Sequence, residues 1–137
     1  MKKTHTKLKK ELDKVFSQYV RYAAADDNGI VECYTCYNKK HVKEMHNGHF
    51  ISRRHLSTRW DENNCRPQCP RCNLFAQGEQ WLFGSRLTAE LGEDIVQQLQ
   101  IKSKQASKFS TVELQEMIDY YKARLKELIY LLSTFNC

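Results

Sequence analysis

Two pairs of cysteines are the residues in this chain whose type and spacing point most directly to chemistry. Cys33 and Cys36 form one CxxC pair, and Cys69 and Cys72 form the other. Zinc prefers a tetrahedron of thiolates, and two cysteines separated by two residues bind one metal ion from a tight turn. The sequence therefore predicts one structural zinc ion held by all four thiolates. The alternative is a redox pair or unrelated buried thiols.

The segment between the two pairs is long and carries several polar side chains. It contains 32 residues, whereas a simple zinc ribbon has about 15–20 residues there. His46, His49 and Asn64 lie within this insert, and Asn73 follows the second pair directly. The insert therefore holds candidates for a second, chemically active site.

Composition and charge narrow the class of protein. The 137 residues suit a single domain. No apolar run approaches the ~20 residues of a membrane span, and the N-terminal segment lacks the apolar stretch of a secretory signal. We therefore expect a cytoplasmic protein with no membrane partner, in which Cys65 and Cys137, lacking a CxxC partner, stay free thiols.

Positive charge concentrates around the predicted zinc site. The net charge is +6, and residues 33–72 hold eight Lys or Arg against three acids, together with four of the five histidines. A basic surface favours an anionic partner, and nucleic acid is the usual one.

Periodicity predicts helices at both ends of the chain and short strands between them. Apolar residues at three- and four-residue steps predict an amphipathic helix over 5–25. Short strands are expected between residues 30 and 58, the second over about 48–53, followed by a loop over 57–68. Helices are expected from Pro70 to about Gln77 and over 79–91, 93–105 and 110–133, the last opened by a Ser110/Glu113 capping box. The predicted fold class is α+β.

The motifs resemble those of a known family, the HNH endonucleases with a ββα-metal fold and a four-cysteine zinc site. The chain has Gly48-His49, then Arg59-Trp-Asp-Glu-Asn-Asn64, then Gln68-Cys-Pro-Arg-Cys-Asn73. With this order and spacing it resembles most closely the phage Rap/NinG recombination nucleases, over most of its length from about residue 10.

The resemblance implies a fold and a substrate. It implies a single domain, 1–137, with an N-terminal helix over 1–29, a zinc-bearing ββα-metal core over 30–78 and a helical extension over 79–137. It also implies a structure-specific DNA endonuclease that cuts branched recombination intermediates such as Holliday junctions, D-loops and forks. A phage or prophage protein in the cytoplasm of a bacterial host follows from the resemblance alone.

Phosphodiester cleavage assigns roles to three residues of these motifs. A neutral histidine takes a proton from water near physiological pH, so His49 is the expected general base. A catalytic Mg²⁺ or Mn²⁺ ion stabilises the charge on the phosphate and leaving oxygen, and Asn73 is expected to provide one ligand. Asn64 is expected to orient the histidine strand through hydrogen bonds.

One position departs from the family pattern. Many HNH enzymes have an acidic metal ligand directly before the histidine, where this chain has Gly48. His46 is the first candidate for the missing ligand, because residues two apart in a strand face the same side. Asp61 is the second candidate, since a carboxylate suits a hard ion. The glycine is also a position at which a phosphate backbone can approach closely.

Basic and aromatic side chains complete the expected DNA site. The arginines of the core are expected to contact phosphates, with a solvated charged face as the alternative. They are Arg53, Arg54, Arg59, Arg66 and Arg71. Trp60 and Trp81 are expected in the core, with base stacking as the lesser alternative.

Other functions and assembly states stay open at this point. A noncatalytic zinc module that binds DNA through its basic face would need the same cysteines, and a restriction or homing nuclease would cut linear duplex. The apolar residues of the last helix step like a coiled-coil seam and are Leu114, Ile118, Tyr121, Leu125, Leu128 and Leu132. A symmetric junction needs two matched cuts, so a homodimer is expected, although the seam can also pack within its own domain.

Overall fold

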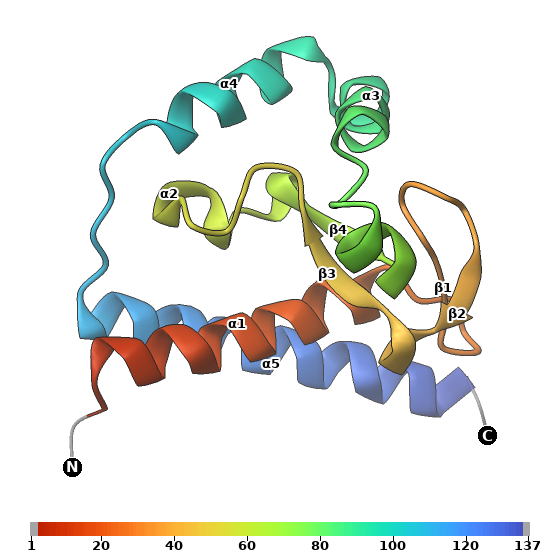
Figure 1. Ribbon diagram of the computed structural model, residues 1–137. Coiled ribbons are helices and arrows are strands. Elements are labelled where there is room, and N and C mark those ends of the chain that lie inside the picture. Colours follow the sequence, from red (N-terminus) through yellow and green to blue (C-terminus); the bar gives the residue numbers. More distant parts are fainter. Residues whose placement is uncertain (1–2, 136–137) are drawn as a thin grey trace.

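The computed structural model describes residues 3–135, in which helices surround two small antiparallel sheets (Figure 1). The helical turns η1–η3 are short. The elements in order are α1 (His5–Ala23), β1 (Ile30–Glu32), β2 (Lys39–His41), η1 (Val42–Glu44), β3 (His46–His49), α2 (Leu56–Arg59), η2 (Glu62–Asn64), β4 (Cys65–Gln68), η3 (Arg71–Phe75), α3 (Gln80–Leu91), α4 (Glu93–Ser103) and α5 (Thr111–Phe135). The predicted α+β class is confirmed.

Helices α1 and α5 lie side by side and form the base of the molecule (Figure 1). The apolar stripe predicted along the first helix is buried, with Leu12 and Phe16 almost inaccessible to solvent. The capping box is also present, because Glu113 N–H donates to Ser110 Oγ and Ser110 N–H donates to the Glu113 carboxylate. Both terminal helices are therefore where their periodicity and caps place them.

The seam of α5 faces α1 of the same chain. Leu114, Ile118 and Tyr121 are buried in the cluster that α1 contributes to, and Leu125 and Leu128 pack against it. The first part of the seam is therefore used within the domain. No helix of residues 3–135 has the length and apolar character needed to cross a bilayer.

The central sheets place a strand–strand–helix unit above this base. β1 pairs with β2, and β3 pairs with β4 in a register that sets His46 opposite Gln68 and His49 opposite Cys65. The helical turn η3 follows β4 directly. Because β3 and β4 form a two-stranded sheet, the outer edge of β3 is free to line a cavity.

Two sequence predictions in this region are wrong. The strand expected over 48–53 ends at His49, because the side chain of Asn64 hydrogen-bonds both the N–H and the C=O of Ile51, so neither enters a strand ladder. The loop expected over 57–68 instead contains α2, η2 and β4. Downstream, the helices expected over 79–91 and 93–105 are confirmed as α3 and α4, separated at Gly92, whose φ is +94°.

Candidate functional site

The four cysteines of the two CxxC pairs come together as predicted. The Sγ atoms of Cys33, Cys36, Cys69 and Cys72 all lie within 4.8 Å of one another. Four thiolates at 2.3 Å around a tetrahedral zinc ion are about 3.8 Å apart. The cluster is therefore compatible with a structural zinc ion, and all four ligand positions belong to the protein. Within residues 3–135, no other group of three or more His, Cys, Asp or Glu side chains gathers in this way.

Backbone geometry holds the cysteines in place. Tyr37 follows the first pair with a φ of +67°, which closes the turn so that its N–H donates to the Cys33 carbonyl. The N–H of Cys69 donates to Cys33 Sγ at 3.3 Å, which joins the two turns. Burial alone would raise the pKa of Cys33, but backbone N–H groups from Cys69, Cys36 and Thr35 lower it to about 6. A lowered pKa favours the metal-binding thiolate at Cys33, whereas burial raises the pKa of Cys69 and of Cys72.

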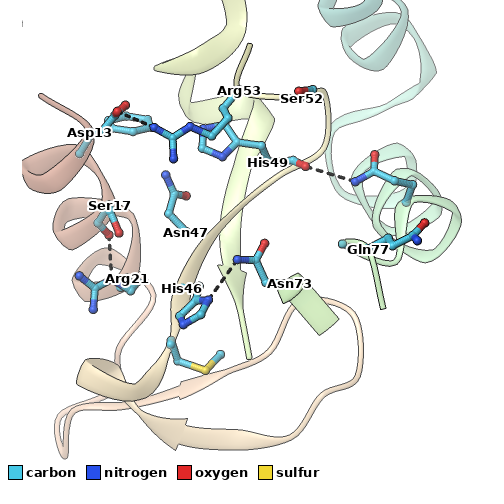
Figure 2. Close-up of a pocket in the computed structure, with 14 residues that line it drawn as sticks. Asp13, Ser17, Arg21, His46, Asn47, His49, Ser52, Arg53, Asn73 and Gln77 are labelled. Atoms are coloured by element: carbon cyan, nitrogen blue, oxygen red, sulfur yellow. Dashed lines mark hydrogen bonds and ion pairs between the residues drawn. The ribbon is translucent and has the colours of Figure 1, made fainter. Parts of the chain in front are cut away.

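A second site lies beside the zinc cluster, in a cavity of about 520 Å³ between α1, β3 and η3 (Figure 2). It brings together four of the residues that the sequence singled out: His46, His49, Asn73 and Arg53. The guanidinium groups of Arg21 and Arg53 outnumber the carboxylate of Asp13 on its walls. The cavity therefore suits an anion.

A hydrogen bond to the backbone fixes which nitrogen of His49 carries the proton. Its Nε2 lies 2.9 Å from the carbonyl oxygen of Arg59, and a carbonyl oxygen only accepts, so Nε2 carries the proton. In the neutral ring Nδ1 is then the free base. Burial lowers the pKa of His49, although the hydrogen bond to Arg59 opposes the shift. The neutral, basic form is therefore favoured at physiological pH.

Asn64 fixes the chain that follows His49. Its side chain is fully buried, accepts from the N–H of Ile51 at 2.8 Å, and donates to the carbonyls of Ile51 and Thr58, both at 3.0 Å. The backbone carbonyl of Asn64 accepts a hydrogen bond from the N–H of Phe50. Asn64 therefore acts on the position of His49 through the backbone and does not line the cavity.

Asn73 and His46 lie together on the wall formed by η3 and β3. Asn73 Nδ2 is 3.1 Å from His46 Nδ1, so the amide donates to an unprotonated ring nitrogen. Neighbouring ligands of an octahedral ion with ~2.1 Å bonds are about 3 Å apart. Rotation of the amide would present Asn73 Oδ1 at the same place. Both side chains are thus close enough to share one metal ion.

Close packing explains why the residue before His49 is a glycine. Gly48 is buried, and a Cβ atom built on it would lie 2.1 Å from Oε1 of Gln68. Gln68 is fully buried and held by hydrogen bonds from its Nε2 to Thr35 Oγ1 and to the Gly78 carbonyl. The close approach at Gly48 is therefore made by Gln68 and not by a phosphate, and an acidic side chain has no room there.

The structure does not bring Asp61 to the cavity. Its carboxylate accepts from the N–H of Asn63 and pairs with Lys102 Nζ at 2.6 Å, on the side of α2 and α4. Asn47 also lines the cavity, but its Oδ1 is buried and has no hydrogen-bond partner among the described residues. Neither Asp61 nor Asn47 therefore presents an exposed oxygen to the cavity.

The predicted DNA-binding arginines divide into two groups. Arg53, Arg54 and Arg71 are exposed, and Arg53 reaches the cavity with a side chain 60% accessible while pairing with Asp13 at 2.7 Å. Arg59 is half-buried and is held by the same carboxylate. Arg66 pairs with Glu90. The second group is engaged within the protein.

Sequence reasoning missed the contribution of α1. Asp13, Ser17 and Arg21 line the cavity (Figure 2). Asp13 accepts from Trp60 Nε1 as well as from both arginines, and Arg59 in turn carries the carbonyl that holds His49. The three residues are spaced four apart, which places them on one helix face. That polar stripe, opposite the apolar one, was the available signal.

The two tryptophans have different fates. Trp60 is buried as predicted, with 5% of its surface exposed. The prediction that Trp81 lies in the core is wrong, because 79% of it is exposed. Its neighbours Phe83 and Leu87 bury the inner face of α3, and Trp81 lies on the outer face of the same helix.

The described free cysteine Cys65 is buried, and Cys137 lies outside the described residues.

Comparison with known proteins identifies the family of this chain. The model of the family described as bacteriophage lambda NinG protein matches residues 1–130. No match was found among curated proteins or among solved structures. Because the family model spans nearly the whole sequence, the chain belongs to the bacteriophage lambda NinG family.

Proposed function

We propose that this protein is a metal-dependent DNA endonuclease that cuts branched recombination intermediates. The observation that carries the proposal is the state of His49. Its Nε2–H is committed to the Arg59 carbonyl, and burial favours the neutral ring, so Nδ1 is the unprotonated nitrogen of a residue that lines a cavity with two arginines. A base beside an anion site is what hydrolysis of a phosphodiester requires.

The residues around the cavity divide the remaining work. Arg53 and Arg21 attract and orient the phosphate, and His49 Nδ1 takes the proton of the attacking water. Asn73 Oδ1 and His46 would hold a divalent ion, Mg²⁺ or Mn²⁺. Such an ion, when bound, stabilises charge on the phosphate and the leaving oxygen.

The donor set fits a weakly held ion. His46 and Asn73 offer no carboxylate, and Asp13, the one carboxylate among the described residues of the cavity wall, is engaged by arginines. A divalent ion bound by so few protein charges depends on phosphate oxygens to complete its shell. Imidazole is also not the preferred ligand of Mg²⁺ or Mn²⁺, which favour oxygen atoms. Metal affinity should therefore rise when DNA is present.

The substrate class rests on the family. Membership of a lambda phage family supports a role in phage recombination, and branched intermediates are the DNA structures that recombination produces. Two matched cuts in a junction need two copies of the site, so the proposal includes a homodimer. Its contact would use surfaces other than the α1-covered seam, such as the exposed end of α5 at Ile129, Tyr130 and Leu131.

One observation favours a second function. Among the described residues, the walls of this cavity hold no carboxylate free of arginine, which suits a noncatalytic, zinc-stabilised DNA-binding module. Such a module would use the cysteines only for folding and the arginines only for phosphate contacts. It predicts binding of DNA with no cleavage under any metal.

Cleavage by a His49→Ala variant separates these functions. Wild-type protein with Mg²⁺ or Mn²⁺ is incubated with junction, fork, single-stranded and linear duplex DNA of equal length. We expect wild type to cut branched DNA, and His49→Ala to keep zinc and DNA binding while losing at least about a hundredfold in rate, as removal of a general base does. His41→Ala, an exposed histidine outside the cavity, is the matched control.

The outcomes are distinct. If wild type nicks none of these substrates, the enzyme proposal is overturned in favour of the binding module. Cutting of linear duplex at one sequence would instead indicate a restriction or homing type of nuclease. Equal rates for His49→Ala and wild type would remove His49 from the mechanism.

A further inference from the structure

The segment that joins the zinc cluster to α3 exposes an unusual amount of apolar surface. The exposed fractions are 60% for Leu74, 82% for Phe75, 79% for Trp81 and 43% for Leu82. Large aromatic side chains bury most of their surface in ordinary folds, and exposed clusters mark places where something binds. We call Phe75 and Trp81 the aromatic pair.

Both members of the aromatic pair are close in sequence to residues that line the cavity. Phe75 lies between the wall residues Asn73 and Gln77, and Trp81 follows the wall residue Gln80. Gln80 Nε2 donates to the carbonyl of His49 at 3.3 Å, so a hydrogen bond joins the start of α3 to the strand that carries the proposed base.

A second hollow adjoins the cavity on the side of Trp81. Its volume is about 530 Å³, and Phe50, Trp81 and Gly84 line it. Gln80 lines both hollows, so a chain that leaves the cavity reaches Trp81 next. A polymer with a phosphate in the cavity would place its neighbouring unit against this tryptophan.

The backbone beneath the aromatic pair is fixed in a rare conformation. Gln77, Gly78 and Glu79 have φ values of +52°, +81° and +49°. Left-handed conformations at residues other than glycine cost energy and persist only where the surroundings enforce them. Here the N–H of Gly78 donates to the Cys72 carbonyl at 2.7 Å, and its carbonyl accepts from Gln68 Nε2. Hydrogen bonds to Cys72 of the zinc cluster and to Gln68 therefore fix the turn that joins Phe75 to Trp81.

The charged residues around the aromatic pair and the cavity indicate what kind of molecule can bind there. Between residues 73 and 85 the one charged residue is Glu79, whereas the adjoining cavity carries Arg21 and Arg53. The occupant must therefore be anionic in one part and flat and apolar in the next. A nucleic-acid strand has this pattern, with phosphates along its backbone and bases that stack on aromatic side chains.

We propose that Trp81 and Phe75 stack on unpaired bases of the DNA strand whose phosphate enters the cavity. Bases within a continuous duplex are already stacked on their neighbours, whereas single strands and branch points offer free faces. The aromatic pair thereby selects branched or single-stranded DNA over linear duplex. This inference rests on the proposed function for its substrate but not for its test.

Tryptophan fluorescence tests the stacking directly. The chain has two tryptophans, of which Trp60 is buried and Trp81 is 79% exposed. The whole protein is titrated with a single-stranded dT oligonucleotide, and in parallel with linear duplex of equal length, in EDTA-free buffer without added divalent metal. We expect the single strand to quench Trp81 and the duplex to leave it nearly unchanged.

Substitutions at position 81 separate stacking from other effects. Trp81→Ala should lose the quenching and bind the oligonucleotide roughly 5- to 100-fold more weakly, the range that loss of one stacked base gives. Trp81→Phe should lose the quenching but keep affinity within about threefold, because phenylalanine still stacks. Tyr120→Ala, which removes a 50% exposed aromatic side chain from α5, should change neither.

Each contrary outcome has a defined meaning. Equal affinity of Trp81→Ala and wild type, or equal quenching by single strand and duplex, overturns the inference. Quenching by vesicles of anionic lipid but not by DNA assigns the surface to a membrane and overturns it as well. Because these measurements need no cleavage, an inactive His49→Ala protein that still quenches would leave the stacking surface intact even if the nuclease proposal failed.

Discussion

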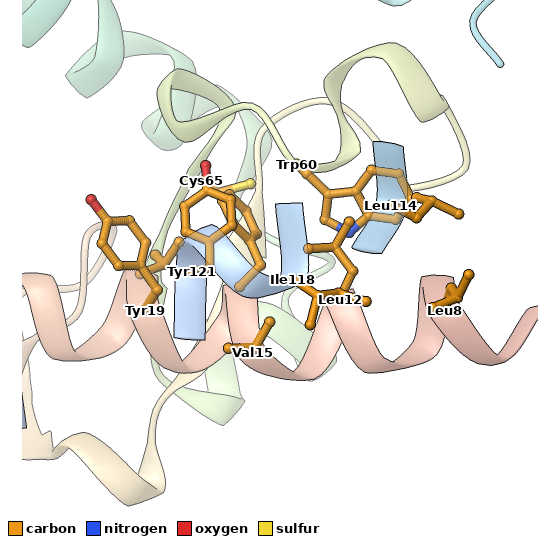
Figure 3. Packing of buried hydrophobic residues seen from close by; sticks show 11 residues of the cluster. Leu8, Leu12, Val15, Tyr19, Trp60, Cys65, Leu114, Ile118 and Tyr121 are labelled. Carbon is orange, nitrogen blue, oxygen red and sulfur yellow. The ribbon is translucent and has the colours of Figure 1, made fainter. Parts of the chain in front are cut away.

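The two faces of α1 belong to regions built in different ways. One face packs on α5 in an apolar cluster that includes Leu8, Leu12 and Ile118 (Figure 3). The other face presents Asp13 and Ser17 to the cavity beside β3 (Figure 2). The helix pair comes from two periodic segments, whereas the cavity is assembled from short pieces of α1, β3, η3 and the turn before α3.

This difference separates stability from chemistry. The helix pair buries side chains such as Phe16 and Leu12 completely, and burial of apolar surface is the main source of folding free energy. The cavity is instead lined mainly by polar residues, and Asn47 Oδ1 has no hydrogen-bond partner among the described residues. We therefore expect substitutions in the helix pair to change stability, and substitutions in the cavity to change binding and cleavage.

Removal of the zinc should have the largest effect and tests whether the two regions fold separately. Structural zinc supplies an apparent ~10–16 kcal/mol of binding free energy, more than most domains have as total stability. Cys69→Ala should therefore lose the bound zinc and unfold the β3–η3 side. The α1–α5 pair should keep much of its helicity, as measured by circular dichroism and zinc content.

Cys65→Ala provides the control for this experiment. Cys65 is buried in the helix-pair cluster and lies outside the zinc site, so this variant should retain one zinc per chain. Complete loss of helical signal in Cys69→Ala would show that the two regions form one cooperative unit.

Truncation of a buried side chain in the helix pair should lower the free energy of unfolding without changing the functional site. Leu12 is completely buried, and Leu→Ala changes in such positions cost about 2–5 kcal/mol. Denaturant unfolding of Leu12→Ala should show this loss. Cleavage per folded molecule at low temperature should stay within about twofold of wild type, and a larger loss would mean that packing of α1 controls the site.

A methyl group at Gly48 should give an intermediate effect. Its Cβ would meet Gln68 Oε1 at 2.1 Å, and overpacking of this kind costs about 1–3 kcal/mol. Gly48→Ala should therefore unfold at lower denaturant concentration. The double variant Gly48→Ala/Gln68→Ala should be more stable than the sum of the two single changes predicts, because the truncated partner leaves room for the methyl group. Additive losses would contradict this explanation of the glycine.

Acid should weaken the fold through His49. Because burial lowers its pKa in the folded state, the unfolded chain binds the proton more readily. This contribution to stability is complete above the ordinary pKa of about 6.5, falls below it, and levels off under the folded pKa. Unfolding free energies at pH 8, 6 and 5 should therefore drop more for wild type than for His49→Gln, in which the other four histidines are unchanged.

The contrast between the helix pair and the cavity also explains which features could be predicted from the sequence. The periodic residues of α1 and α5 and the Ser110/Glu113 box specify their helices locally, and all three are present. The four cysteines were identified because zinc imposes a fixed spacing. In contrast, β4 has no alternating pattern and exists through its pairing with β3, which no local signal reports.

In the cavity, the sequence indicates which local motif residues can do chemistry, but it does not indicate which distant residues the fold brings beside them. His49 and Asn73 both line the cavity, and the sequence singles them out through motif spacing that is local to the cysteines. Asp13 was missed because the contact that matters, its pairing with Arg59, spans 46 residues of sequence. Trp81 was misplaced because an aromatic residue in a helix is expected inside, and its exposure depends on which face of α3 meets the core.

Loss of Arg53 should have the smallest effect on the fold while changing DNA binding. Its ion pair with Asp13 is exposed to water, so Arg53→Ala should cost less than about 1 kcal/mol of stability. A phosphate contact should nevertheless be lost, which lowers affinity for all DNA substrates alike and reduces the slope of log affinity against log salt by about 1. Arg66→Ala, which removes an arginine engaged by Glu90, should leave that slope unchanged. An equal change of slope in both variants would mean that their shared charge, and not the position of Arg53 at the cavity, attracts the DNA.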